Sequence, residues 1–343
     1  MSRNGKSSPL PPYLRWAGPL LAPGYGLGVR VHRAFSTPRK APLPVICIGN
    51  LTVGGTGKTP AVKYIARGLA QRLWRPAILM RGYKGQDADE AEEVNAALAD
   101  LKLPSPVIVN PDRLAGATLA KERGCDCVVL DDGFQHWALK RDLDIVLIDA
   151  SDPFGGGRLL PYGRLREPVA GLMRAGVVII TRCDAVDSAE LERLRAEIKR
   201  LAPSAAIATA RHAPGKIRAL HGREPEPPDL RGRSIVAACG IGNPNAFRRT
   251  LESLGACIAD FRTFPDHHRY TQVEIDALLA RTRDMKVDAL VVTEKDSPKL
   301  ARLKLADGQP VWVLPVSFEI VDGEGELWKR VEHALAASAA PNP

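Results

Sequence analysis

Residues 45–60 have the residue types and spacing of a phosphate-binding loop. An apolar run from Val45 leads into a glycine-rich turn that ends in Gly57-Lys58-Thr59. Glycines let backbone N–H groups surround phosphate oxygens, the lysine reaches the β- and γ-phosphates, and the threonine hydroxyl binds Mg²⁺. A helix expected from Thr59 to Trp74 points the positive end of its dipole at the same anion. The sequence predicts a nucleoside triphosphate site with these ligands: Thr52, Val53, Gly54, Gly55, Thr56, Gly57, Lys58 and Thr59.

Acidic residues follow two other apolar runs and are candidates for the metal side of this site. Val128-Val-Leu-Asp131-Asp132 has the form that supplies a carboxylate to Mg²⁺ beside a phosphate loop. The pattern leaves open whether Asp131 or Asp132 serves the metal. Asp149, after a similar run, is a competing candidate, and Glu167 is a further metal-side candidate.

Arginines at the ends of expected strands are candidates for neutralising the charge of a triphosphate. Phosphoryl transfer depends mainly on positioning and on charge neutralisation, so cations should surround the γ-phosphate. Arg81, Arg113 and Arg166 each lie in a loop that follows an apolar run. Open α/β sheets bind ligands at the carboxyl ends of their strands, which favours a binding role for Arg81 and Arg113 and a catalytic role for Arg166.

The hydrophobic pattern predicts two α/β domains. Short β-branched runs alternate with helical periodicity, as in a mostly parallel sheet with helices on both faces. We expect a basic apolar segment at 1–42, a phosphate-loop domain at 43–212, a linker at 213–233 that is rich in proline and glycine, and a smaller α/β domain at 234–338. A length of 343 residues suits two domains.

Composition narrows the class of protein. Hydrophobic residues make up 45% of the chain and charged residues 25%, which is ordinary for a globular protein with a sizeable core. Six cysteines are scattered without a CxxC pair, which argues against a structural zinc site and favours buried, reduced thiols.

The net charge of +9 is concentrated near the N-terminus. Seven Lys or Arg residues and no acidic residue precede Val45, so basic stripes over the folded domains, typical of nucleic-acid proteins, are not expected. The apolar stretch from Tyr13 to Val29 is interrupted by Arg15, Pro19 and Pro23, which argues against a spanning helix. Two interpretations stay open from these features: a segment at the membrane interface that binds anionic lipids, or a tail packed on the first domain.

Five segments together resemble the tetraacyldisaccharide 4′-kinase family of lipid A biosynthesis. They are Gly49-Asn-Leu-Thr-Val-Gly-Gly-Thr-Gly-Lys-Thr-Pro60, Leu130-Asp-Asp-Gly-Phe-Gln-His136, Leu160-Pro-Tyr-Gly-Arg-Leu-Arg-Glu-Pro168, Phe264-Pro-Asp-His-His268 and Thr293-Glu-Lys-Asp296. The resemblance implies ATP and Mg²⁺ as cofactors, a lipid A precursor (a tetraacyldisaccharide 1-phosphate) as acceptor, and a peripheral location at the cytoplasmic face of the inner membrane. With a lipid acceptor implied, interfacial binding becomes the favoured interpretation of residues 1–42.

The resemblance also implies a catalytic carboxylate and a partner histidine. Asp89-Glu90-Ala91 occupies the place of the family's Asp-Glu-Pro, so Asp89 is the expected base and Glu90 the alternative, and His267 matches the histidine. Lys58 and Arg166 complete the expected catalytic set.

Two other classes compete with a lipid kinase. Thr181-Arg-Cys-Asp184 faintly resembles the guanine-reading Asn/Thr-Lys-x-Asp element, which points to a GTP-dependent switch or a metallochaperone-type protein. A soluble nucleoside or sugar kinase is the third possibility, but it leaves the basic apolar N-terminus unexplained.

Overall fold

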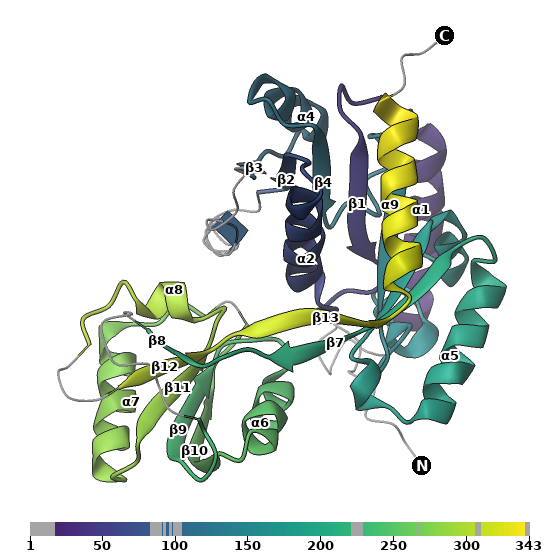
Figure 1. Ribbon diagram of the computed structural model, residues 1–343. Helices are drawn as coiled ribbons and strands as arrows, with labels where there is room; N and C mark the ends of the chain where they lie inside the picture. The colour runs from purple at the N-terminus through teal and green to yellow at the C-terminus, as the bar shows by residue number, and fades with distance from the viewer. Residues whose placement is uncertain are drawn as a thin grey trace. The chain divides into compact units, whose positions relative to one another are not determined.

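The computed structural model in Figure 1 describes residues 18–82, 91, 94–95, 98, 105–220, 229–266, 268–305 and 310–339. The chain forms two compact units. The first comprises Met1–Asp87, Val94–His212 and Phe318–Pro343, and the second comprises Ala88–Glu93 and Ala213–Ser317.

The first unit is built on an eight-stranded sheet in the order β13-β7-β6-β5-β1-β4-β2-β3. Its strands are β1 (Val45–Asn50), β2 (Pro76–Met80), β3 (Val107–Val109), β4 (Cys127–Asp131), β5 (Leu143–Asp149), β6 (Val177–Thr181), β7 (Ala206–Pro214) and β13 (Val316–Asp322). Its helices are α1 (Gly18–Phe35), α2 (Lys58–Gln71), α4 (Arg113–Glu122), α5 (Ser188–Leu201), α9 (Glu324–Ala339) and the short turns η2 (Gly155–Gly157), η3 (Val169–Arg174) and η4 (Cys183–Ala185).

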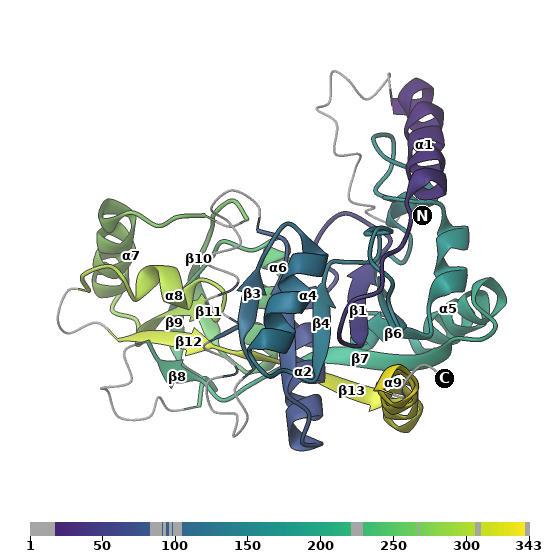
Figure 2. The ribbon, with the colours of Figure 1, turned by 90° about the horizontal axis from the view of Figure 1, so that it is seen from above.

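Both faces of this sheet are covered, which explains the continuous apolar runs in its strands. From β3 to β7 each neighbouring pair is parallel, and β1, β2, β4 and β6 are buried along their whole length. Figure 2 shows α2 and α9 on one face and α4 and α5 on the other. Parallel strands place their carboxyl ends at one edge, so the loops after β1, β4, β5 and β6 are neighbours.

The second unit has its own core around a five-stranded sheet in the order β10-β9-β11-β12-β8. The strands are β8 (Arg218–Ala219), β9 (Ser234–Cys239), β10 (Cys257–Thr263), β11 (Ala289–Thr293) and β12 (Val311–Leu314). The helices are α6 (Pro244–Ser253), α7 (Gln272–Asp284) and α8 (Ser297–Leu300). Apolar side chains of α7 pack on one face of this sheet and those of α6 on the other. A capping box at Thr271 opens α7.

The structure confirms the predicted α/β class with a mostly parallel sheet, but it places the C-terminal segment differently. We expected residues 234–338 to form the smaller domain, whereas β13 is the edge strand of the eight-stranded sheet and α9 packs on the first unit. The expected linker also differs, because β8 lies within it and pairs with β12. These pairings join segments about a hundred residues apart, and local periodicity carries no signal for them.

The N-terminal apolar stretch forms a helix, α1, despite Pro23 inside it. Two glycines let it approach the first unit closely: a Cβ on Gly26 would lie 2.9 Å from Leu159 Cδ1, and one on Gly18 would lie 3.1 Å from Tyr162 Cα. The Tyr25 hydroxyl donates to the backbone oxygen of Arg166 at 3.0 Å. One face of α1 is therefore attached to the loop that carries Arg166.

The helix α9 packs against α2 at Gly68, and this close contact predicts a loss of stability when a side chain is added there. A Cβ on Gly68 would lie 2.2 Å from Trp328 Cη2, and the Trp328 side chain is buried under the Arg72 guanidinium. Gly68→Ala gains about 1 kcal/mol of helix propensity, but overpacking against a rigid indole costs typically 1–3 kcal/mol. We expect the melting temperature, followed by circular dichroism, to fall by about 2 °C or more.

Gly325→Ala is the matched control, because a Cβ there meets nothing within 4 Å at the start of α9. Its melting temperature should equal or exceed that of the parent protein. Equal melting temperatures for the two variants would contradict the packing of α9 on α2.

Candidate active site

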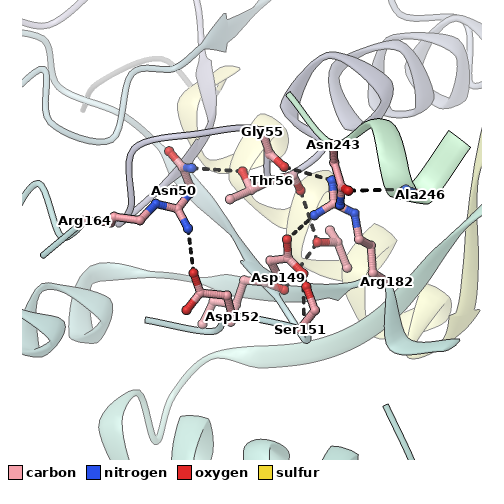
Figure 3. Close-up of polar contacts among 12 residues, drawn as sticks. Asn50, Gly55, Thr56, Asp149, Ser151, Asp152, Arg164, Arg182, Asn243 and Ala246 are labelled. Atoms are coloured by element: carbon pink, nitrogen blue, oxygen red, sulfur yellow. Dashed lines mark hydrogen bonds and ion pairs between the residues drawn. The ribbon is translucent and has the colours of Figure 1, made fainter. Parts of the chain in front are cut away.

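The phosphate loop runs from the end of β1 to the start of α2, and the side chain of Asn50 holds it by hydrogen bonds. Asn50 is fully buried and donates through Nδ2 to Thr56 Oγ1 at 2.9 Å (Figure 3). Its Oδ1 accepts from Lys58 Nζ at 3.5 Å. Gly54 and Gly57 have φ of 114° and 88°, a region that favours glycine. Gly57 is also the N-cap of α2, so the helix begins directly at the loop. The loop thus has the form of an anion site at a helix N-terminus.

Lys58 and Arg166 converge on one carboxylate, that of Asp132. The Lys58 Nζ lies 3.9 Å from Asp132 Oδ1, and Arg166 Nη1 donates to Asp132 Oδ1 and Oδ2 at 2.8 and 2.9 Å. Asp132 follows β4 with a positive φ of 52°, which turns its side chain out of the strand direction. Burial raises the pKa of Asp132, but Lys58 and Arg166 outweigh it and hold this pKa below its ordinary value. The carboxylate is therefore ionised at neutral pH and fixes both cations.

The segment 164–166 pairs with the phosphate loop as a short strand would. Thr52 and Leu165 form an antiparallel bridge, Val53 N–H donates to Arg164 O at 2.8 Å, and Arg166 N–H donates to Leu51 O at 2.8 Å. The Arg164 side chain donates to Asp152 and to the backbone oxygen of Val53 (Figure 3). The loop after β5 thereby fixes the shape of the phosphate loop and the position of Arg166.

Glu167 is the buried centre of a second ion-pair network. Its two oxygens accept from Arg174 Nη1 and Nη2 at 2.9 Å each, and Oε1 also accepts from Gln135 Nε2 at 3.0 Å. The same Gln135 nitrogen donates to Asn50 O at 2.9 Å, and Gln135 Oε1 accepts from Arg166 at 3.3 Å. Glu167 therefore orients Gln135, which in turn contacts both the end of β1 and Arg166.

Arg81 and Arg113 add positive charge near His136. Arg113 is buried at the first turn of α4 and donates to Asn110 O at 2.8 Å. Burial lowers the pKa of His136, and the charges of Arg113 and Arg81 act in the same direction. His136 is therefore neutral at pH 7, and Arg81 and Arg113 are positive charges that act on it from the loops after β2 and β3.

On the other side of the phosphate loop, the end of β6 is tied to it by two hydrogen bonds. Thr181 Oγ1 donates to Thr56 O at 3.1 Å, and Arg182 Nη2 donates to Gly55 O at 2.9 Å (Figure 3). Arg182 also pairs with Asp149, whose Oδ1 accepts from the Ser151 hydroxyl at 2.6 Å. Asp149, the competing metal-side candidate, is thus engaged with Arg182.

The donor set at this edge suits Mg²⁺, which prefers carboxylate and hydroxyl oxygens. Thr59 lies in the first turn of α2, the buried Asp131 ends β4, and the ion-paired Asp132 follows it. Glu167, the fourth metal-side candidate, has both oxygens engaged by Arg174 and Gln135. Asp89, Glu90 and His267 lie outside the described residues.

The sequence proposed the loop, Asp131 or Asp132, and Arg166 as site residues, and the structure brings Lys58, Asp132 and Arg166 together. The motifs gave no such role to the residues that hold them. Asn50, Gln135 and Arg182 occur in the sequence only as members of longer runs, Arg182 within Thr181-Arg-Cys-Asp184, and Arg174 belongs to no motif. Three of these four side chains contact residues more than 30 positions away, and Asn50 contacts Thr56 within the loop itself. The polar Asn50 at the end of an otherwise apolar buried strand was the one available signal.

Comparison with known proteins identifies relatives over nearly the whole chain. The family model described as tetraacyldisaccharide-1-P 4′-kinase matches residues 16–336. A tetraacyldisaccharide 4′-kinase of Anaeromyxobacter sp. (strain Fw109-5) is 40% identical over 97% of this chain and 93% of its own length. A tetraacyldisaccharide 4′-kinase of Syntrophus aciditrophicus (strain SB) is 36% identical over 86% and 84%. The crystal structure of LpxK from Aquifex aeolicus in complex with ATP is 26% identical, with a TM-score of 0.70 over 94% of this chain and 99% of that chain.

The Glu167 network predicts a stability effect that does not depend on any ligand. Glu167→Gln leaves the Arg174 guanidinium in a largely buried site without its counter-charge, and breaking such a pair costs about 3–5 kcal/mol. We expect urea unfolding of the variant to begin at a clearly lower concentration. Glu326→Gln, which breaks the exposed pair with Lys329, should change stability by less than about 0.5 kcal/mol. Similar midpoints for the two variants would show that the Glu167 network adds no stability.

Proposed function

The chain belongs to the tetraacyldisaccharide-1-P 4′-kinase family, and we propose that it transfers the γ-phosphate of ATP to the 4′-hydroxyl of a tetraacylated glucosamine disaccharide 1-phosphate in lipid A biosynthesis. The observation that carries this proposal is the convergence of Lys58 and Arg166 on Asp132 beside a phosphate loop. Family membership favours this kinase over the GTP-dependent switch, the metallochaperone-type protein and the soluble sugar kinase.

The chain's own residues supply preorganised positive charge for the transfer. Backbone N–H groups from Gly54 to Thr59 bind phosphate oxygens, and Lys58 lies beside them at the start of α2. Arg166 is held at the same place by Asp132 and Gln135. Because these cations are fixed before the reaction, little reorganisation is needed as charge shifts toward the leaving oxygen.

Mg²⁺ fits the metal side of this site. The oxygens of Thr59 and of Asp131 or Asp132 would hold the ion, which supplies neutralisation of the β- and γ-phosphate charge when bound. Arg81 and Arg113 contribute further positive charge at the same sheet edge. Asp89 is proposed as the acceptor of the sugar hydroxyl proton and His267 as its partner, both from the family resemblance.

Two variants separate nucleotide binding from transfer. Lys58→Ala removes the fixed counter-charge of the phosphates, so we expect transfer to fall by at least about 10²–10³-fold and ATP affinity to fall with it. Asp89→Asn removes general-base assistance, so transfer should fall by about 10²–10⁴-fold while ATP affinity stays unchanged. Turnover of detergent-solubilised lipid A precursor and equilibrium binding of ATP measure the two effects.

The outcomes are distinct. Parent-level turnover by Lys58→Ala would overturn the phosphate-loop assignment. Near-normal turnover by Asp89→Asn would leave the kinase proposal standing and would move the role of base to Glu90. Parent protein that binds ATP but does not phosphorylate the precursor would overturn the proposed acceptor.

The α1 surface supports the proposed attachment to anionic lipid at the cytoplasmic face of the inner membrane. Among the described residues, no helix is both long and apolar enough to cross a membrane. Four exposed apolar side chains repeat at intervals of seven, four and four residues and so share one face of α1: Leu20, Leu27, Val31 and Phe35. Arg30 and Arg33 lie on the same helix, as expected for a basic interfacial helix. Tyr25 attaches the helix to the Arg166 loop on another side.

A charge placed on this apolar stripe should weaken membrane binding. Val31→Glu removes about 1.5 kcal/mol of apolar transfer and adds repulsion from anionic headgroups, so we expect co-sedimentation with phosphatidylglycerol vesicles to fall by about tenfold or more. Val273→Glu makes the same change at an exposed position on α7 and should bind like the parent. Equal binding by both variants would mean that α1 does not contact the membrane.

A further inference from the structure

The peptide oxygens of the phosphate loop, residues 53–57, all act as hydrogen-bond acceptors. Those of Gly54 and Gly57 accept from the backbone N–H groups of Thr56 and Ala61, each at 3.1 Å. The other three accept from side chains that belong to distant segments, and they are the oxygens of Val53, Gly55 and Thr56. Each peptide oxygen of the loop is thus engaged by a partner within the chain itself.

Most N–H groups of the same loop are left for a ligand. Val53 and Thr56 donate their N–H groups to backbone oxygens. Among the residues that the structure describes, nothing accepts from the other N–H groups between positions 53 and 59, those of Gly54, Gly55, Gly57, Lys58 and Thr59. Lys58 and Thr59 belong to the first turn of α2, where helical geometry provides no acceptor. The loop therefore offers an anion N–H donors without competing oxygens.

Arg164 engages the first of the three oxygens that side chains hold. Its guanidinium donates to Val53 O and pairs with the Asp152 carboxylate (Figure 3). The Arg164 side chain is 12% exposed. A Cβ on Gly54 would lie 2.3 Å from Arg164 Nη2, so the guanidinium lies directly against the backbone of the loop. Glycine at position 54 therefore makes room for this arginine as well as for a positive φ.

The end of β6 engages the other two oxygens. Arg182 donates through Nη2 to Gly55 O at 2.9 Å, and the same guanidinium pairs with Asp149 (Figure 3). The buried Thr181 hydroxyl donates to Thr56 O at 3.1 Å. Asp149 offsets the charge of Arg182 as Asp152 offsets that of Arg164. Both arginines therefore act on the loop through the direction of their hydrogen bonds more than through net charge.

We propose that Arg164 and Arg182 are positioning residues for ATP, which turn the oxygens of Val53 and Gly55 away from the phosphates and keep the loop preformed. Glycine allows peptide units to rotate at little cost, and a rotated unit would present its oxygen to a phosphate. Fixing the loop in advance lowers the ordering cost of binding. The proposal rests on the proposed kinase function and adds that the loop recognises a polyphosphate chain without its nucleoside.

The decisive measurement is the affinity for ATP and for inorganic tripolyphosphate, each with Mg²⁺ and without lipid acceptor, by titration calorimetry. Arg164→Ala and Arg182→Ala should each weaken both ligands by the same factor, about tenfold or more, because each releases one peptide oxygen held by a charged donor. At saturating ATP the KM for the lipid acceptor should stay at the parent value, because the change is confined to the phosphate loop.

Two further variants separate position from charge and from general stability. Arg182→Lys keeps the charge but lacks the planar fork that spans Asp149 and Gly55 O, so we expect it to bind tripolyphosphate several times more weakly than the parent. Arg195→Ala is the matched control: it removes an ion pair with Asp322 in the same unit, and it should bind both ligands like the parent. Should an alanine variant fail to fold by circular dichroism, Arg164→Lys and Arg182→Lys test the same point.

Each outcome decides the matter. Parent-level tripolyphosphate binding by a folded alanine variant would overturn the role of that arginine. Full affinity in Arg182→Lys would mean that charge alone is needed, and a parent that binds ATP but not tripolyphosphate would overturn the preformed loop. A larger loss for ATP than for tripolyphosphate would place the arginine at the nucleoside instead. Binding as expected without lipid phosphorylation would contradict the proposed function and leave the positioning role standing.

Discussion

Positive charge must be held at the phosphate loop before any phosphate arrives, and the buried carboxylates of this chain meet that constraint. Lys58 and Arg166 would repel each other at close range without Asp132 between them. Arg174 is held in the same way by Glu167, and Arg182 by Asp149. Lys58, Arg166 and Arg182 are thus each fixed by a carboxylate from another segment of the chain, so the site depends on the register of several parallel strands.

The carboxylates also divide the edge into regions with different chemistry. Asp132 lies on the side of β4, where we propose that Thr59 and Asp131 or Asp132 hold the metal. Asp149 lies on the side of β5 and is engaged by Arg182, away from the Lys58 cluster. Asp132 and Asp149 thus stand at the ends of two parallel strands but contact different arginines, Arg166 and Arg182.

The helix α1 links this site to the proposed lipid surface through short connections. Tyr25 donates to the backbone of Arg166, and glycines at positions 18 and 26 let the helix lie close to residues 159–162. Burial raises the pKa of the Tyr25 hydroxyl, so it stays a neutral donor at physiological pH. The stripe that we propose faces lipid and the loop that carries Arg166 are therefore attached to each other, which would suit an acceptor drawn from a bilayer.

The sequence alone determined what depends on neighbouring residues. The phosphate loop is contiguous, and its glycines, lysine and threonine depend on backbone geometry and on a helix that begins at the loop, so residues 45–60 were enough to predict a glycine-rich turn between a buried strand and a helix. Uninterrupted β-branched runs also predict buried parallel strands, and the run that includes Asp131 and Asp132 placed carboxylates at the carboxyl end of one of them.

Only the tertiary structure decided what depends on distant pairing. The attachment of β13 and α9 to the first unit, the fixing of Gln135 by Glu167, and the engagement of Asp149 by Arg182 join segments that share no local pattern. Their energies come from burial and from charge pairing between loops, which exist only once the sheet has brought the strand ends together.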